Sequence, residues 1–464
     1  MAATMGGSGS ADPMHRPCDT STGPAAATGG NAISLFSNCG AGDVGFADAG
    51  FQFRIMAERV ESRLAVALRN HPSAQGVPGD LRDTWRDVAK LWQANHGASV
   101  PDLLAACPPC QGMSTARSDR GAENDPDASS RDPRNLLVLP IAAIAAELQP
   151  TIVVVENVAA FLRRLVRDPQ STEPVSAARL LSRLLEDSYD VFPFLTDLAD
   201  YGVPQTRKRA FLTFVRRNSP EANALRQAKR APYPTPTSAP DYGGHATTLE
   251  VALQGFGLAS LDAADRARAA DPEHPLHFVP VWPERQYRMV AAIPPGSGAS
   301  AWENTRCDNC GPIDADAQTV VCGVCGEPLL RPVVLDDERP RLAYGFRRVS
   351  YRRMDPARPA ATITTASGRV GGSRTIHPFE NRILSPLECA LLQTIPSDFD
   401  CGRVVEDRGV MELRAMIGEA VPPQFTRLHG QLLMRLMTEH RAGPRAIGLA
   451  DRRCETAGSA LRPN

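Results

Sequence analysis

With 464 residues, of which 42% are hydrophobic and 22% charged, the chain has the composition of a soluble globular protein and the length for two or three domains. It has no run of about 18 apolar residues, and its Gly/Ala/Ser/Thr-rich N-terminus lacks the regions of a secretory signal, so we expect neither a membrane span nor export. The 11 cysteines do not form a disulfide scaffold in so long a chain and favour a reducing cytoplasm, while the net charge of −1 argues neither for nor against nucleic acid.

A possible cofactor loop follows the N-terminal tail. Residues 1–30 are of low complexity and are expected to be disordered. The first predicted strand, Ala32 to Phe36, leads into a glycine-rich turn and then a helix, an order that cradles nucleotide cofactors in many folds. By itself the turn is explained as well by a tight loop without a ligand. The acids at the ends of later strands, Glu58 and Asp80, strengthen the cofactor interpretation, because such acids bind ribose hydroxyls.

Two cysteines follow the next apolar stretch. Residues 100–106 predict a short strand, and Cys107-Pro108-Pro109-Cys110-Gln111 comes directly after it. Open α/β sheets place their chemistry at the carboxyl ends of strands. The two prolines restrict the direction of the loop, which predicts that the thiol of Cys110 is presented rather than packed. Two alternatives stay open here: the pair could be half of a zinc site or a redox pair, and Cys110 could be structural.

Strands and helices alternate up to residue 215. A helix is expected over 136–148, a buried parallel strand over Thr151 to Val155, a helix over 177–185 and a strand over 210–215. The strand at 151–155 ends in Glu156, a carboxylate that is expensive to bury unless it has a partner or a function. The alternation predicts an α/β fold with a doubly wound, Rossmann-like sheet.

Taken in order, these motifs resemble those of the cytosine-5 DNA methyltransferases. Phe36 to Phe46 is similar to the cofactor loop of the family, Pro109-Cys110-Gln111 to its nucleophile motif, and Glu156-Asn157-Val158 to its base-holding motif. Four later segments resemble the remaining motifs in the family's order: 205–209, 358–364, 382–399 and 418–423. The resemblance spans about 32–435 and departs from the family at Asn38, which usually is glycine, and at Glu419, which usually is asparagine.

The resemblance implies a DNA (cytosine-5-)-methyltransferase that uses S-adenosylmethionine. Cys110 would form a covalent adduct with a flipped-out cytosine, and Glu156 would bind ring nitrogen 3, with Arg207 and Arg209 holding it and the base. Cys107 is then expected to be structural. The residues implied to bind the cofactor are Phe36, Gly40, Glu58, Asp80, Pro109, Leu137 and Val421.

The region at 216–357 falls where the family carries its variable target-recognition domain. It contains two CxxC pairs separated by eleven residues, each followed by glycine: Cys307, Cys310, Cys322 and Cys325. This spacing predicts a structural zinc ribbon over 307–326, and the alternative is four free thiols in a loop. Basic runs at 207–217 and 339–353 are read as either solvated faces or a rim that contacts phosphates.

The expected organisation is a catalytic domain at 31–215 and 358–440, the target-recognition domain at 216–357, and a flexible tail at 441–464. The expected partner is double-stranded DNA, bound by a monomer in the cytoplasm, and a cognate restriction endonuclease is a further candidate partner. Three alternatives are a tRNA cytosine-5 methyltransferase, a nicotinamide oxidoreductase and a non-enzymatic zinc-ribbon DNA-binding protein.

Overall fold

The computed structural model describes residues 29–109, 132–167, 174–336, 339–343, 349–372 and 374–441. The two predicted tails, apart from Gly29, Gly30 and Arg441, lie outside this part of the chain, and so do Cys110 and the residues that follow it up to 131. Within the described residues, no helix combines the length and the apolar character needed to cross a membrane.

A seven-stranded sheet with the order β3-β2-β1-β4-β5-β9-β8 forms the larger body. Its first five strands are parallel, and β9 runs antiparallel to both β5 and β8. All four residues of β4 are buried, as are the first six of β5, because helices cover both faces. The strands are β1 (Gly30–Leu35), β2 (Phe51–Glu58), β3 (Gln75–Pro78), β4 (Leu103–Ala106), β5 (Ile152–Val158), β8 (Tyr189–Asp197) and β9 (Lys208–Arg216).

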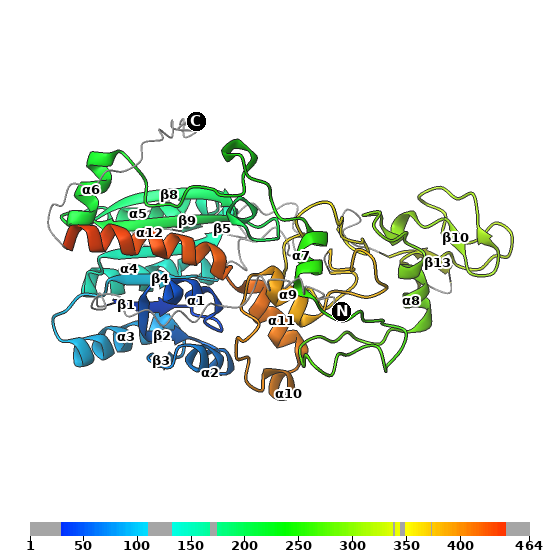
Figure 1. Ribbon diagram of the computed structural model, residues 1–464, viewed down its shortest axis with the longest axis horizontal. Helices are drawn as coiled ribbons and strands as arrows, with labels where there is room; N and C mark the ends of the chain where they lie inside the picture. The colour runs from blue at the N-terminus through cyan, green and yellow to red at the C-terminus, as the bar shows by residue number, and fades with distance from the viewer. Residues whose placement is uncertain are drawn as a thin grey trace, which may run out of the picture.

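Helices pack on each face of this sheet, so the predicted doubly wound α/β fold is confirmed. One face carries α3 (Leu81–His96), α4 (Val138–Leu148) and α5 (Ala177–Leu185), whose apolar residues share one core with the strands. The other face carries α1 (Ala41–Asp48), α2 (Glu61–Asn70) and α12 (Pro423–Arg441). Helix α12 lies beside α1 although it comes last in the chain (Figure 1). Their contact requires Gly45, where a Cβ would lie 2.1 Å from the Pro423 carbonyl oxygen.

A second, smaller part extends away from the sheet and contains little regular structure (Figure 1). Its helices and strands, with those that join it to the sheet, are α6 (Pro220–Ala228), α7 (Leu249–Phe256), α8 (Glu284–Ala291), β10 (Arg306–Cys307), β11 (Gly311–Pro312), β12 (Val333–Asp336), β13 (Arg339–Leu342), α9 (Pro386–Leu392), α10 (Val404–Arg408) and α11 (Val410–Glu419). A two-stranded ribbon of β6 (Leu165–Arg167) and β7 (Pro174–Ser176) and five short 3-10 helices complete the described chain: η1 (Pro133–Leu136), η2 (Ala159–Leu162), η3 (Leu198–Tyr201), η4 (Pro240–Tyr242) and η5 (Ala301–Glu303).

Apolar packing crosses the expected boundaries at residues 216 and 357, which stay a prediction. Helix α6 still belongs to the sheet, since its buried Leu225 packs in a cluster with Val215 of β9. At the other boundary, Ile376 and Ile383 pack in the core of the second part, in a cluster with Trp282. Apolar contacts therefore assign 220–228 to the larger body and 376–383 to the smaller one.

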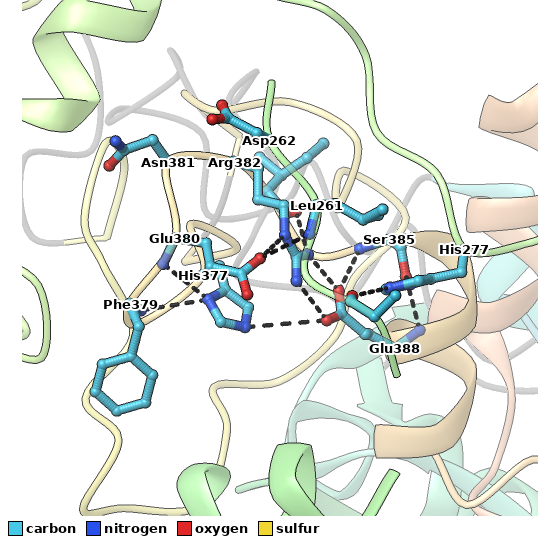
Figure 2. A network of polar contacts seen from close by, with 12 residues as sticks. Leu261, Asp262, His277, His377, Phe379, Glu380, Asn381, Arg382, Ser385 and Glu388 are labelled. Atoms are coloured by element: carbon cyan, nitrogen blue, oxygen red, sulfur yellow. Dashed lines mark hydrogen bonds and ion pairs between the residues drawn. The ribbon is translucent and has the colours of Figure 1, made fainter. Parts of the chain in front are cut away.

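A buried polar network joins the second part to α9 (Figure 2). Arg382 and Glu388 form a two-pronged ion pair with N–O distances of 2.7 and 2.8 Å, and both side chains are almost fully buried. Ser385 and Glu388 make a reciprocal capping box at the start of α9, and His277 Nδ1 lies 2.8 Å from Ser385 Oγ. Glu388 thus anchors a helix terminus and an arginine at once.

Replacement of Glu388 by glutamine is expected to lower the free energy of unfolding by roughly 3 kcal/mol. This is the lower end of the range for breaking a buried pair, because Arg382 keeps its contact with Glu380. Denaturant unfolding measures the loss. As a control, Asp407→Asn, in an exposed pair with Arg403, is expected to change stability by less than about 0.5 kcal/mol.

The contribution of Glu388 to the free energy of unfolding should depend on pH. Burial by itself raises the pKa of Glu388, but the attraction and hydrogen bonds of Arg382 outweigh it and lower the pKa to about 2. The contribution of Glu388 is therefore complete above its ordinary pKa of 4.5 and is lost as the pH falls towards 2. Equal stability of Glu388→Gln and the native protein at pH 7 would contradict this assignment.

Candidate active site

A cavity of about 1130 Å³ opens at the carboxyl ends of the parallel strands, in the larger body. The ends of β1 to β5 form its floor, and residues 418–421, at the end of α11 and directly after it, close it from the side. This is where an open α/β sheet positions a ligand. Most of the residues predicted to act on cofactor or base line it within the described chain: Phe36, Glu58, Asp80, Pro109, Leu137, Glu156, Arg207, Arg209 and Val421.

Gly40 is an exception, because it does not line the cavity. Its φ of 76° is left-handed, and a Cβ there would lie 2.9 Å from His71 Cδ2. Its carbonyl oxygen lies 2.9 Å from His71 Nε2. Gly40 is therefore required by the turn and by the approach of α2, and its predicted contact with the cofactor stays a prediction.

Two carboxylates lie at the ends of successive strands, where they can accept hydrogen bonds from hydroxyl or amino groups. Glu58, at the end of β2, accepts hydrogen bonds from the backbone N–H groups of Asn38 and Val60, both at 3.0 Å. Asp80 caps α3 by accepting from the N–H of Arg82 and also pairs with its guanidinium at 2.6 Å. The hydrogen bonds from Arg82 lower the pKa of Asp80 and keep it charged.

The two departures from the family pattern lie at the junction between the first and the last motif. Asn38 Nδ2 donates to the carbonyl oxygen of Met416 at 2.8 Å. Glu419 pairs with Arg63 at 2.6 Å, and Arg63 pairs also with Glu412 at 2.6 Å. Both departures therefore tie α11 to the loop and helix that follow β1 and β2, which closes the side of the cavity.

A further buried acid was not predicted from the sequence. Asp43, in the first turn of α1, lines the cavity and accepts a hydrogen bond from Ser34 Oγ at 2.8 Å. Burial raises the pKa of Asp43 to about 7. Asp43 lies inside the predicted cofactor loop, Phe36 to Phe46, and only its burial distinguishes it from an ordinary residue of a helix N-terminus.

Glu156 and Arg209 meet at the other end of the cavity. Glu156 is only 7% exposed, and its Oε1 lies 2.9 Å from Arg209 Nε. The register of β5 and β9 explains the pair: Val158 lies opposite Arg209, so Arg209 and Glu156 are diagonal neighbours on one face of the sheet. Glu156 Oε2 accepts a second hydrogen bond, from Cys107 Sγ at 2.8 Å. The sequence did not predict this contact.

Arg207 lies among backbone carbonyl groups. Its guanidinium is 1% exposed and donates to the carbonyl oxygens of Ile363, Gly418 and Ala420 at 2.8–3.0 Å. These hydrogen bonds join the C-terminal segment to the sheet, and the predicted role of Arg207 in holding Glu156 and the base stays a prediction. Arg353, in the second basic run, is also buried and donates to four backbone carbonyls, so it cannot form a phosphate-binding rim.

The four cysteines of the expected ribbon converge. Their sulfur atoms all lie within 4.8 Å of one another, and those of Cys307 and Cys325 are 3.5 Å apart. Four sulfurs bound tetrahedrally at about 2.3 Å from zinc would be about 3.8 Å apart. Gly311 and Gly326 have φ values of 74° and 77°, as the turns after each CxxC pair require. The cluster has the ligand type and spacing of a closed metal site.

Comparisons with known proteins agree with this arrangement. The family model of C-5 cytosine-specific DNA methylases matches residues 30–252 and 335–431 and omits the cysteine cluster. Type II methyltransferase M1.HgaI of Avibacterium volantium is 25% identical over 406 residues, covering 84% of this chain and 94% of that protein. M.AquIA of Picosynechococcus is 29% identical over 211 residues, covering 45% and 77%.

Among solved structures, an E. coli protein described as a prophage-encoded DNA modification methyltransferase superposes with a TM-score of 0.56 at 18% identity. The match covers 88% of this chain and 99% of that one. At this identity the likeness concerns the fold.

Proposed function

The chain belongs to the C-5 cytosine-specific DNA methylase family, and we propose that its cavity holds S-adenosylmethionine beside a flipped-out cytosine that Cys110 attacks. Methylation of carbon 5 of cytosine in DNA is the activity of the family. The observation that carries the finer proposal is Glu156, buried and held by Arg209, in the same cavity as the carboxylates of Glu58 and Asp80. The end of the cavity with Glu156 and Arg209 is suited to a pyrimidine, and the end with Glu58 and Asp80 is suited to a nucleoside.

The described residues fit the cofactor. Glu58 and Asp80 would supply acceptors for the ribose hydroxyls and the adenine amino group. The apolar side of the cavity is formed by Phe36, Leu137 and Val421. When bound, S-adenosylmethionine supplies the methyl group as an electrophile. The remaining chemistry belongs to the protein side chains and the base.

The reaction needs a nucleophile because carbon 5 of cytosine is unreactive by itself. The Cys110 thiolate adds to carbon 6, and negative charge develops on the ring towards nitrogen 3. Glu156 shares a proton with nitrogen 3 and is held by Arg209, which stabilises that charge. Carbon 5 would then be methylated, with S-adenosylhomocysteine as the leaving group. It loses its proton to a base or water, and the electrons of that bond expel the sulfur from carbon 6 as the thiolate.

DNA must deliver the cytosine out of the helix, since Glu156 lines the cavity and is almost fully buried. Basic side chains among the residues that line the cavity could contact phosphates, which position the duplex without reading its sequence: Arg59, Arg163 and Lys208. We assign base recognition to the second part of the chain. We further propose that the enzyme acts as a monomer. The names of its relatives, type II methyltransferases, support a place in a restriction-modification system, and we propose a cognate restriction endonuclease beside it.

The decisive experiment is to map 5-methylcytosine in the DNA of a host that lacks this modification and expresses the chain. We expect one short sequence to be methylated throughout the genome. The purified protein is then incubated with S-adenosylmethionine labelled in its methyl group and either duplex DNA or tRNA. Label in tRNA alone, or in neither, would contradict the proposed function.

We propose that the four cysteines bind structural zinc, which holds the recognition region together. Within the described chain, the buried apolar core around the cluster consists of Cys307, Cys322 and Leu329, too few residues to fold a ribbon alone. A closed four-thiolate site leaves no open position for catalysis, so the metal would act through folding.

Cys322→Ser is expected to reduce bound zinc from about one ion per chain to near zero and to impair site-specific methylation, while S-adenosylhomocysteine binding persists. Metal analysis, titration calorimetry and methylation mapping on the same preparation test the three links. Cys401→Ser is the control, because Cys401 lies outside the cluster. Full zinc content in Cys322→Ser, or unchanged site selection without zinc, would refute the proposal.

A further inference from the structure

The thiol of Cys107 contacts the carboxylate that the proposed reaction depends on. Cys107 Sγ donates to Glu156 Oε2 at 2.8 Å, although the two residues are 49 positions apart. The backbone around the thiol is fixed from both sides. The N–H of Cys107 donates to the Leu35 carbonyl oxygen at 3.2 Å, and the carbonyl oxygen of Pro108 accepts from Asn157 Nδ2 at 2.9 Å. The thiol therefore approaches Glu156 from a rigid strand end.

The contact completes the support of Glu156. Arg209 holds Oε1 at 2.9 Å, and Cys107 holds Oε2. Rotation of the carboxylate about its last side-chain bond would break both contacts. Each oxygen still has a lone pair for a ligand, because a carboxylate accepts up to about four hydrogen bonds. The pair of donors thus sets the plane of the carboxylate without blocking it.

Building on the proposed function, we propose that Cys107 is a positioning residue, whose thiol fixes the Glu156 carboxylate in the plane of the target cytosine. The orientation matters because Glu156 must meet nitrogen 3 and the neighbouring amino group of one planar ring, and a misplaced acid loses its catalytic contribution. The sequence predicts a structural role for Cys107, and this proposal instead gives its thiol a part in the reaction through Glu156.

Two other roles for this thiol are less well supported. As a proton source it would have to protonate a carboxylate, although a thiol is a much weaker acid than a carboxylic acid, so the transfer is uphill. As a nucleophile it would need to be a thiolate, and a neighbouring carboxylate disfavours that form. A thiol that keeps its proton and donates it in a hydrogen bond fits the position best.

The main test compares Cys107→Ala with Cys107→Ser in single-turnover methylation of a duplex that contains the mapped site. Loss of a hydrogen bond to a charged group should slow Cys107→Ala by roughly tenfold to hundredfold, with little change in cofactor or DNA affinity. The serine hydroxyl can donate in the same direction, so Cys107→Ser should recover to within about threefold of the native rate. An equal loss in both variants would overturn the proposal.

A double-mutant comparison separates positioning from packing. In a Glu156→Ala background there is no carboxylate to position, so Cys107→Ala should slow the reaction by less than about twofold further. If Cys107→Ala costs the same factor in both backgrounds, the thiol acts through packing and the proposal fails.

A measurement without DNA distinguishes this proposal from the proposed function. Alkylation of Cys107 by iodoacetamide, followed by peptide mass mapping, reports how strongly the carboxylate suppresses the thiolate. Glu156→Ala should raise the alkylation rate several-fold. An unchanged rate refutes the contact even if the native enzyme methylates DNA. Accelerated alkylation in a protein that methylates no cytosine would instead overturn the proposed function, and with it the catalytic role of the contact.

Discussion

Replacement of Cys110 by alanine is expected to abolish methyl transfer. Without a sulfur atom to add to carbon 6, carbon 5 of cytosine stays unreactive, and we expect the single-turnover rate to fall by a factor on the order of 10⁴ or more. Fold and cofactor affinity should be nearly unchanged, because the predicted loop presents this thiol rather than packing it. Circular dichroism and S-adenosylhomocysteine titration check both.

The neighbouring cysteine supplies the matched control. Cys107→Ala removes the same atoms three residues earlier, from a thiol whose hydrogen bond goes to Glu156. It should leave a measurable rate and should still form a covalent complex with a duplex carrying 5-fluorocytosine at the target position. Cys110→Ala should form none. If the trapping results were exchanged, Cys107 would be the nucleophile, and the assignment drawn from Pro109-Cys110-Gln111 would be wrong.

The sequence predicted the central elements closely, because their signal is local. The β-branched run at 151–155 lies almost wholly within β5, and the predicted helix at 177–185 coincides with α5. The strand β8 was not predicted. It contains Pro193, and it pairs only with β9 at one edge of the sheet, where proline is tolerated and burial is incomplete. Edge strands lack the continuous apolar run that marked the central ones.

The site was predictable in its motifs but not in its contacts. Arg207 and Arg209 are two residues apart and look equivalent in the sequence. Only the return of residues 358–435 to the sheet surrounds Arg207 with carbonyl groups, while Arg209 is left facing Glu156. The contact of Cys107 with Glu156 likewise depends on which strands become neighbours, since β4 and β5 lie side by side only after α4 has crossed the sheet.

Replacement of Glu156 by glutamine is expected to slow the chemical step by roughly 10²–10⁴-fold. Glutamine has nearly the same shape and can still accept from Cys107, but it has no negative charge for Arg209 and no proton to share with nitrogen 3. The loss should appear in the single-turnover rate at saturating cofactor and DNA. A near-native rate would remove Glu156 from the mechanism.

The same substitution at Glu58, at the opposite end of the cavity, shows whether the lost rate comes from contact with the base or with the cofactor. Glu58 lines the cavity at the end of β2, three strands away from β5 in the sheet, and its carboxylate accepts from the backbone at Asn38 and Val60. Glu58→Gln should therefore weaken S-adenosylhomocysteine binding by about tenfold, yet leave the saturated rate within a few-fold of native. Glu156→Gln should do the reverse, with cofactor affinity changed by less than about threefold. This crossed pattern follows from the order of the strands, because the proposed nucleoside site at the carboxyl end of β2 and the proposed base site at that of β5 are three strands apart in one sheet.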